Sequence, residues 1–243
     1  MKLLKLLFVV LSFSALQIRA QIVHHELWSR IYLNHELPKG FKIESEYQFR
    51  VQNKPYENII PTTHLAHAAR VWIYKKAGNT WRIGLSPFAI FRNYPSITTE
   101  DDLVKSNNWE IRFAANAECT YKIGSFGLRY RPGFEERLTK PDNKEEWTSS
   151  PRMRNRLQID CNFAKVDSSL APLTVSVGDE HFFRIEELMH EEPCFDQNRV
   201  FAGVAWKFNK MVSLSANAFL IHRPGSSGYN QHRMLWINLI IEI

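Results

Sequence analysis

The chain has 243 residues, of which 44% are hydrophobic and 23% charged, and its formal net charge is +6. Its basic residues are dispersed rather than clustered, so we expect no nucleic-acid partner. Its three cysteines, Cys119, Cys161 and Cys194, are an odd number, which excludes a complete disulfide framework, and they lack metal-site spacing.

The first twenty residues have the organisation of a secretory signal peptide. Two lysines precede an apolar run from Leu6 to Leu16, and Ala20 stands at a suitable −1 position. The run is well short of the roughly 20 residues that a spanning helix needs, so a membrane anchor is the weaker interpretation. We expect removal of residues 1–20, with three basic residues, which lowers the net charge from +6 to +3. Residues 21–243 then form a single domain.

The mature chain is organised as a series of strand-like runs with alternating polarity. In FKIESEYQFRVQ, residues 41–52, Phe41, Ile43, Tyr47, Phe49 and Val51 share one parity, and charged and amide side chains fill the other. Successive side chains of a strand point to opposite faces, so this pattern predicts a strand between two different media. Eleven candidate runs occur, at 22–37, 41–53, 62–76, 81–94, 108–123, 126–137, 152–166, 171–186, 198–209, 212–223 and 231–243.

Alternation alone does not say which parity faces inward, but the connections between the runs are informative. Short turns, at 38–40, 77–80, 124–125, 167–169 and 209–211, alternate with longer polar loops, at 54–61, 95–107, 139–150, 188–197 and 224–231. Short periplasmic turns and long extracellular loops are the plan of outer-membrane barrels. We therefore predict an all-β fold, an antiparallel transmembrane β-barrel in the outer membrane of a Gram-negative bacterium.

Two further features bear on this barrel. Aromatic residues gather beside the short turns, as in the girdles of outer-membrane barrels; they are Tyr74, Trp81, Tyr121, Phe126, Trp206 and Phe208. Single-chain bacterial barrels have even strand numbers, so eleven candidate runs predict ten or twelve strands, with one run misassigned.

The charged parity predicts a network in the barrel lumen. Charges inside a narrow barrel must be paired or hydrated, and guanidinium groups pair bidentately with carboxylates. An excess of arginine around Arg129, Arg131, Arg154 and Arg156 is the basis of an alternative, an anion-attracting constriction. The predicted lumen residues are Glu44, Glu46, Arg50, Arg82, Arg92, Glu110, Arg112, Glu118, Arg129, Arg131, Arg154, Arg156, Asp160, Glu180 and Arg184.

The sequence contains no recognisable catalytic or metal-binding motif. In GDEHFF, residues 178–183, the favoured reading puts Asp179 and His181 near a rim and Glu180 in the lumen. In THLAH, the separation of His64 and His67 predicts opposite faces of a strand. We therefore predict no catalytic residues, no metal site and no cofactor, and favour a non-enzymatic protein.

Three segments give the chain a resemblance to a known family. HELWSRIYLNHELPKGFKIESEYQFR near the amino terminus, RMRNRLQIDCNF in the centre and RMLWINLIIEI at the end resemble bacterial outer-membrane β-barrel proteins grouped as a family of unknown function. The resemblance implies a fold and a location, with outer-membrane lipid and the barrel-assembly machinery as partners. It leaves a narrow structural or transport barrel as the expected function, with an outer-membrane lipid-modifying enzyme or a soluble exported binding barrel as alternatives.

Overall fold

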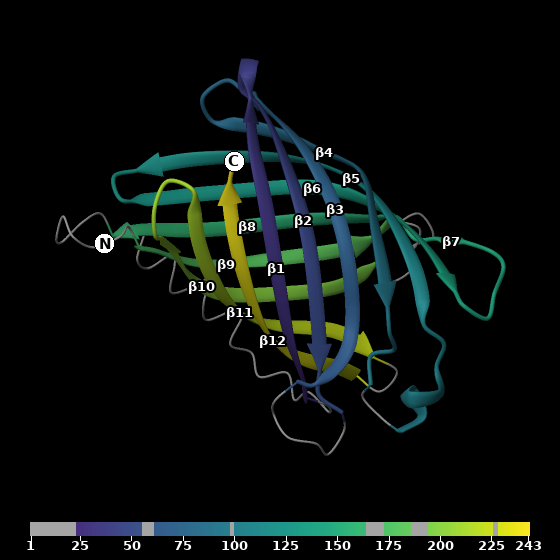
Figure 1. Cartoon of the computed structure of the whole chain (residues 1–243). Coiled ribbons are helices and arrows are strands. Elements are labelled where there is room, and N and C mark those ends of the chain that lie inside the picture. The colour runs from purple at the N-terminus through teal and green to yellow at the C-terminus, as the bar shows by residue number, and fades with distance from the viewer. Residues whose placement is uncertain (1–22, 55–60, 98–99, 164–172, 186–193, 226–227) are drawn as a thin grey trace.

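A computed structural model of the chain describes residues 23–54, 61–97, 100–163, 173–185, 194–225 and 228–243. Within these residues eleven strands close a barrel, and a two-residue strand, β7 (Thr148–Ser149), pairs with one of them (Figure 1). The expected signal peptide, residues 1–20, lies outside the described residues. No helix among them is long and apolar enough to cross a bilayer.

Each of the eleven predicted runs corresponds to one wall strand, because period-two alternation is the signature of a strand between unlike faces. The wall strands are β1 (Val23–Leu37), β2 (Phe41–Gln52), β3 (Thr63–Ala77), β4 (Trp81–Asn93), β5 (Asn108–Ile123), β6 (Phe126–Pro141), β8 (Arg152–Phe163), β9 (Leu173–Arg184), β10 (Phe195–Lys207), β11 (Val212–Gly225) and β12 (Gly228–Glu242).

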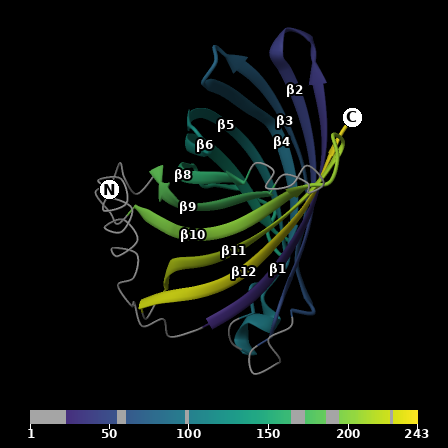
Figure 2. The ribbon, with the colours of Figure 1, turned by 90° about the vertical axis from the view of Figure 1, so that its left-hand side faces the viewer.

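The barrel closes through a parallel pair of strands. Neighbouring wall strands are antiparallel except at the seam, where β1 and β12 run in the same direction from Val23↔Gln231 to Asn34↔Glu242. In the view turned by 90°, β12 lies along β1 and the wall continues through β11, β10 and β9 (Figure 2). The prediction of ten or twelve strands is wrong, because a parallel seam lets an odd number of up-and-down strands close.

The two ends of the barrel differ in their connections. At one end, here called the turn end, lie η1 (Pro38–Gly40) and the short turns at 78–80, 124–125 and 208–211. Three of its glycines, Gly40, Gly78 and Gly124, have positive φ values, which glycine adopts without steric cost. The predicted turn at 167–169 lies outside the described residues.

The opposite end, here called the loop end, carries residues 94–97 and 100–107, with η2 (Glu100–Val104), and the segment 142–151. The predicted loop at 224–231 is not a long loop, because pairing of β11 with β12 continues to Gly225↔Gly228. Cross-strand hydrogen bonding overrides the turn-like composition here. In the same way β6 takes in Thr139–Pro141 and β10 begins at Phe195, inside segments predicted as loops.

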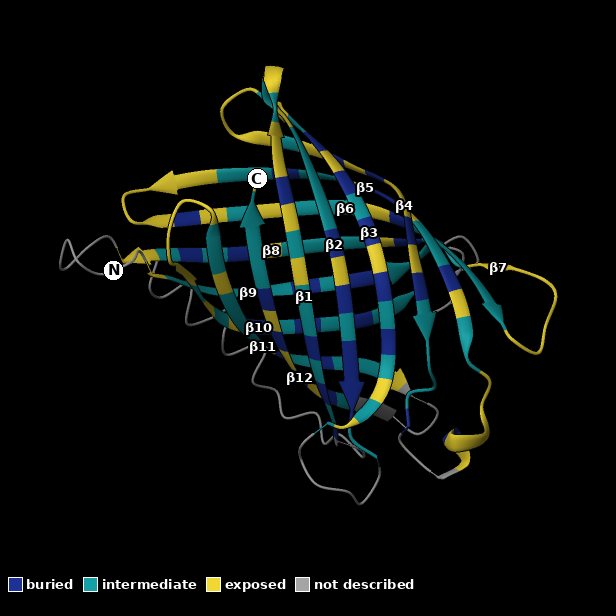
Figure 3. Ribbon diagram, in the orientation of Figure 1, coloured by how far each residue is buried: buried dark blue, intermediate teal, exposed yellow. Residues whose placement is uncertain are grey.

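The apolar parity faces outward and the charged parity faces inward. On β2, Tyr47 is 49% exposed, whereas its neighbours Glu46 and Gln48 are buried. Buried and exposed residues alternate in this way along β1 to β4 (Figure 3). One predicted girdle residue is misplaced: Tyr74 is 5% exposed and stacks on Trp72 inside the barrel.

Candidate functional site: the charged interior of the barrel

The inward side chains surround a cavity of about 800 Å³. Near the turn end its walls carry small polar side chains, such as Thr120, Asn162 and Ser176, and toward the centre they carry arginines, carboxylates and aromatic rings. Because all eleven strands contribute inward residues at every second position, the interior chemistry is set by the whole wall.

The structure brings most of the predicted lumen residues together. Glu110 and Glu180 are buried beside arginines of the cavity wall, in ion pairs with Arg112 and Arg154. Arg184 lies at the loop end of β9, opposite Arg152 in the ladder. Of the predicted lumen residues, those that line the cavity directly are Glu44, Glu46, Arg50, Arg82, Arg112, Glu118, Arg129, Arg131, Arg154, Arg156 and Asp160.

Arg92 does not face the interior, and the prediction for this residue is wrong. The pairing of β4 with β5 shifts between Ser86 and Ala89, and both residues are fully buried, whereas Phe88 is 44% exposed. This β-bulge reverses the parity of the strand, so that Arg92 points outward. Pro87 is the sequence signal, since proline inside a sheet is confined to edges, strand starts and bulges.

Arg92 instead binds Asp142, in the segment that follows β6. Its Nη1 and Nη2 donate to Oδ1 and Oδ2 of Asp142, at 2.6 and 2.5 Å, just beyond the end of β6. This bidentate pair lowers the pKa of the Asp142 carboxyl below its ordinary value, chiefly through the hydrogen bonds from Arg92.

A second bulge corrects the prediction for His64 and His67. The pairing of β2 with β3 shifts between Arg50 and Val51, and the two histidine rings lie 5.6 Å apart and both contact Phe49 on the outer face. Residues three apart in a regular strand lie on opposite faces. The bulge inserts one extra residue between the two histidines, so both lie on the outer face.

Buried carboxylates pair with the arginines, and Glu180, Glu135 and Glu46 are three of them. Glu180 is fully buried, and its Oε1 lies 2.5 Å from Arg154 Nε and 3.7 Å from Arg131 Nη2, while Oε2 lies 3.9 Å from Arg199 Nη1. Glu135 pairs with Arg112 and Arg152, and Glu46 pairs with Arg30.

Other arginines are held by neutral groups. Arg50 donates to Gln48 and lies 3.5 Å over the ring of Trp28, and Arg156 donates to Gln158 and lies 4.3 Å over the ring of Phe201. Among the described residues, no carboxylate lies within ion-pair distance of these two guanidinium groups. Amide oxygens and aromatic faces stabilise cations without neutralising them.

The cavity wall therefore carries an excess of positive charge. Fourteen Arg and Lys side chains line it, against six Asp and Glu side chains. Glu26, Glu110 and Glu180 are buried near it and reduce the imbalance without removing it. An interior of this kind attracts anions.

Several interior residues were not predicted from the sequence. Arg30 follows Trp28 and precedes Tyr32 on the same parity, so aromatic neighbours concealed the charged character of that face. Inward rings also need space: a Cβ at Gly178 would lie 2.4 Å from Cζ of Phe201. The missed charged residues that line the cavity include Arg70, Glu135, Arg137, Arg152, Asp196, Arg199 and Arg223.

The local cluster at 178–183 divides between the two faces. Glu180 is inside, whereas Asp179 and His181 form a pair on the outer face, with Oδ2 3.1 Å from Nε2. In the ladder His181 is flanked by Asn155 and Asn198, whose side chains offer no nucleophilic hydroxyl or thiol.

Comparison with known proteins gives one result that covers most of the chain. No curated protein sequence matches it. The family described as "Protein of unknown function (DUF2490)" matches residues 25–231, from the start of β1 into β12. The match spans well over half of the chain and nearly all of the barrel wall, so the protein belongs to the DUF2490 family, whose function is unknown.

Proposed function

We propose that this protein is an integral outer-membrane barrel whose apolar exterior contacts lipid. The observation that carries the proposal is the polarity of the wall, with charges inside and large apolar side chains outside, as in transmembrane barrels. A barrel in water favours the reverse arrangement, because burying ion pairs while exposing apolar surface costs free energy.

The dimensions of the apolar exterior support this proposal. On β4 the outward residues from Trp81 to Ile90 are all apolar, over a distance of about 30 Å at roughly 3.4 Å per residue. At a tilt of about 40° this corresponds to a height of about 23 Å, close to the apolar band of about 25 Å in outer-membrane barrels. At the turn end, Trp81, Tyr121 and Trp206 are exposed where the lipid headgroups would lie.

Fractionation of cells that express the native chain tests the location. We expect the protein in outer membranes, resistant to extraction by urea, with a mobility on gels that changes when the sample is boiled. Recovery of folded protein from the soluble periplasmic fraction would refute the proposal.

The loop end is proposed to face the cell exterior, because its segments 94–107 and 142–151 are long and polar, while η1 and the turns at 78–80, 124–125 and 208–211 at the turn end are tight. An epitope tag inserted after Asn143, beside Asp142, is expected to bind antibody on intact cells. Loops of this kind tolerate insertion. A tag after Ile243, at the turn end, serves as the matched control and is expected to bind only after the outer membrane is permeabilised. The opposite labelling pattern would invert the topology.

Inside the membrane, the barrel is proposed to be narrow and obstructed by its ion-pair web. In planar bilayers we expect no conductance or a very small one, which rises when Arg154 and Arg156 are both replaced by Ala, since these side chains project into the cavity. Arg233→Ala is the matched control because Arg233 lies on the outer face.

An anion-conducting pore is the second candidate function, and the fourteen basic against six acidic side chains of the cavity favour it. A large, steady, anion-selective conductance of the unmodified protein would establish this candidate and overturn the obstructed barrel.

We further propose that β12, with Leu235, Ile237 and Leu239 facing outward, is the strand that the barrel-assembly machinery recognises.

A further inference from the structure

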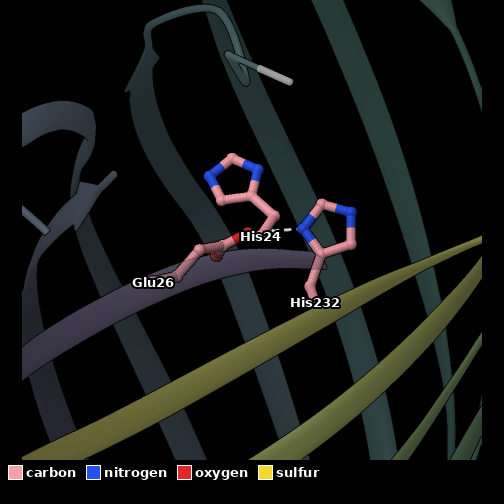
Figure 4. A group of neighbouring side chains, drawn as sticks. All are labelled: His24, Glu26 and His232. Atoms are coloured by element: carbon pink, nitrogen blue, oxygen red, sulfur yellow. Dashed lines mark hydrogen bonds and ion pairs between the residues drawn. The ribbon is translucent and has the colours of Figure 1, made fainter. Parts of the chain in front are cut away.

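Three buried side chains with metal-ligand chemistry meet at the parallel seam. His24 and Glu26 project from the same face of β1, and His232 lies opposite His24 on β12 (Figure 4). The three residues, His24, Glu26 and His232, are 2%, 4% and 3% exposed. This meeting depends on the odd strand number, which places β1 and β12 in parallel register.

The ligand atoms of the three residues are close and held in place. One ligand atom from each lies within 4.8 Å of the other two, and the imidazole rings are stacked with centroids 5.0 Å apart. His232 Nδ1 lies 2.9 Å from Glu26 Oε1, and Trp28 Nε1 donates to Glu26 Oε2 at 2.7 Å. A hydrogen bond such as the one from Trp28 to Glu26 orients a carboxylate that ligates a metal.

One atom of the cluster lacks a hydrogen-bond partner. His24 Nδ1 lies 3.5 Å from Ser96 Oγ, but His24 Nε2 is buried and has no hydrogen-bond partner among the described residues. A buried polar atom without a partner costs free energy, so a ligand to this nitrogen would remove a cost that the fold now carries.

We propose that His24, Glu26 and His232 bind a divalent transition-metal ion, with zinc the best match. Two imidazole nitrogens and one carboxylate oxygen are a common zinc ligand set, which leaves a fourth position for water. Binding replaces the contact between His232 and Glu26, and it links the first wall strand to the last. Parallel pairs are slightly less stable per residue than antiparallel pairs, so the metal would strengthen the seam.

Zinc titration of the purified, untagged full chain in detergent tests the proposal. After treatment with a chelator, the protein is titrated with Zn²⁺ in competition with a chromophoric chelator, and Co²⁺ is used for an absorption spectrum. We expect one Zn²⁺ per chain, and binding weaker by at least about tenfold in His24→Ala and in His232→Ala. The Co²⁺ spectrum is expected to change in both variants.

His25→Ala is the matched control, because His25 follows His24 directly and faces outward. It is expected to bind zinc as the unmodified chain does. Each variant is first checked for the boiling-dependent change of mobility, and zinc is expected to raise the unfolding temperature of the unmodified chain but not of His24→Ala. Absence of zinc binding by the unmodified chain would overturn the proposal, as would equal binding by His24→Ala and His232→Ala.

Discussion

Replacement of Glu180 by Gln is expected to lower the free energy of unfolding by about 3–5 kcal/mol, the usual cost of removing one partner of a buried ion pair. Glu180 is fully buried, and its oxygens lie within 4 Å of Arg154, Arg131 and Arg199. Without its negative charge these cations repel one another in a region of low dielectric constant. Reversible unfolding in urea, with the barrel in lipid vesicles, measures the loss.

Asp179 provides the matched control for this substitution. It precedes Glu180 and faces outward, where it pairs with the half-exposed His181. We expect Asp179→Asn to cost less than Glu180→Gln, because Asp179 has one cationic partner, His181, whereas Glu180 lies within 4 Å of three arginines. Equal losses in the two variants would show that the ion pairs of Glu180 stabilise the barrel no more than the outer pair of Asp179 and His181 does.

Replacement of Leu85 by Arg is expected to destabilise the barrel in a bilayer by about 2–4 kcal/mol, the cost of an arginine on the lipid face near the midplane. Leu85 is 53% exposed and lies about midway along the apolar stretch of β4. If the exterior faced water instead, an arginine there would be nearly neutral. Unfolding in lipid vesicles therefore separates the two surroundings.

An outward residue at a different depth in the proposed bilayer serves as the control for the Leu85 variant. Phe126 is 56% exposed and lies at the turn end, where the headgroups are proposed to be. Phe126→Arg is expected to cost only about 0–1 kcal/mol, because arginine near the interface keeps its charge hydrated. A cost that does not depend on depth would contradict the proposed placement of the barrel in the membrane.

The strands were predictable because each lies between two unlike faces, and period-two alternation records that difference locally. The closure was not, since pairing of β1 with β12 depends on residues at opposite ends of the chain. The count of eleven runs was correct. The prediction of ten or twelve strands was wrong because it assumed the even strand numbers of known bacterial barrels. The prediction of a loop at 224–231 was wrong for a related reason, because turn-like residues do not show which strand will pair with them.

Within the interior, alternation predicted most side chains but not those beyond a bulge. Arg92 follows the bulge at Pro87, and counting by twos carries it to the wrong face. Aromatic residues on the charged parity, such as Trp28 and Tyr74, were also hidden, since polarity alone assigns them outward. The cluster of His24, Glu26 and His232 could not be predicted, because Glu26 and His232 lie 206 residues apart in the sequence.

Spin labels on β5 test most directly whether the apolar exterior contacts lipid. With Cys161 and Cys194 replaced by Ser, one label is placed at Cys119; with Cys119 also replaced by Ser, single cysteines carry a label at the outward position Ala115 and, for comparison, at the inward positions Asn116 and Thr120. In lipid vesicles, the two outward labels are predicted to be relaxed strongly by oxygen, which concentrates in lipid, and weakly by a water-soluble nickel chelate. Inward labels are predicted to respond less to oxygen. Strong relaxation of the outward labels by the nickel chelate would contradict a membrane-spanning barrel.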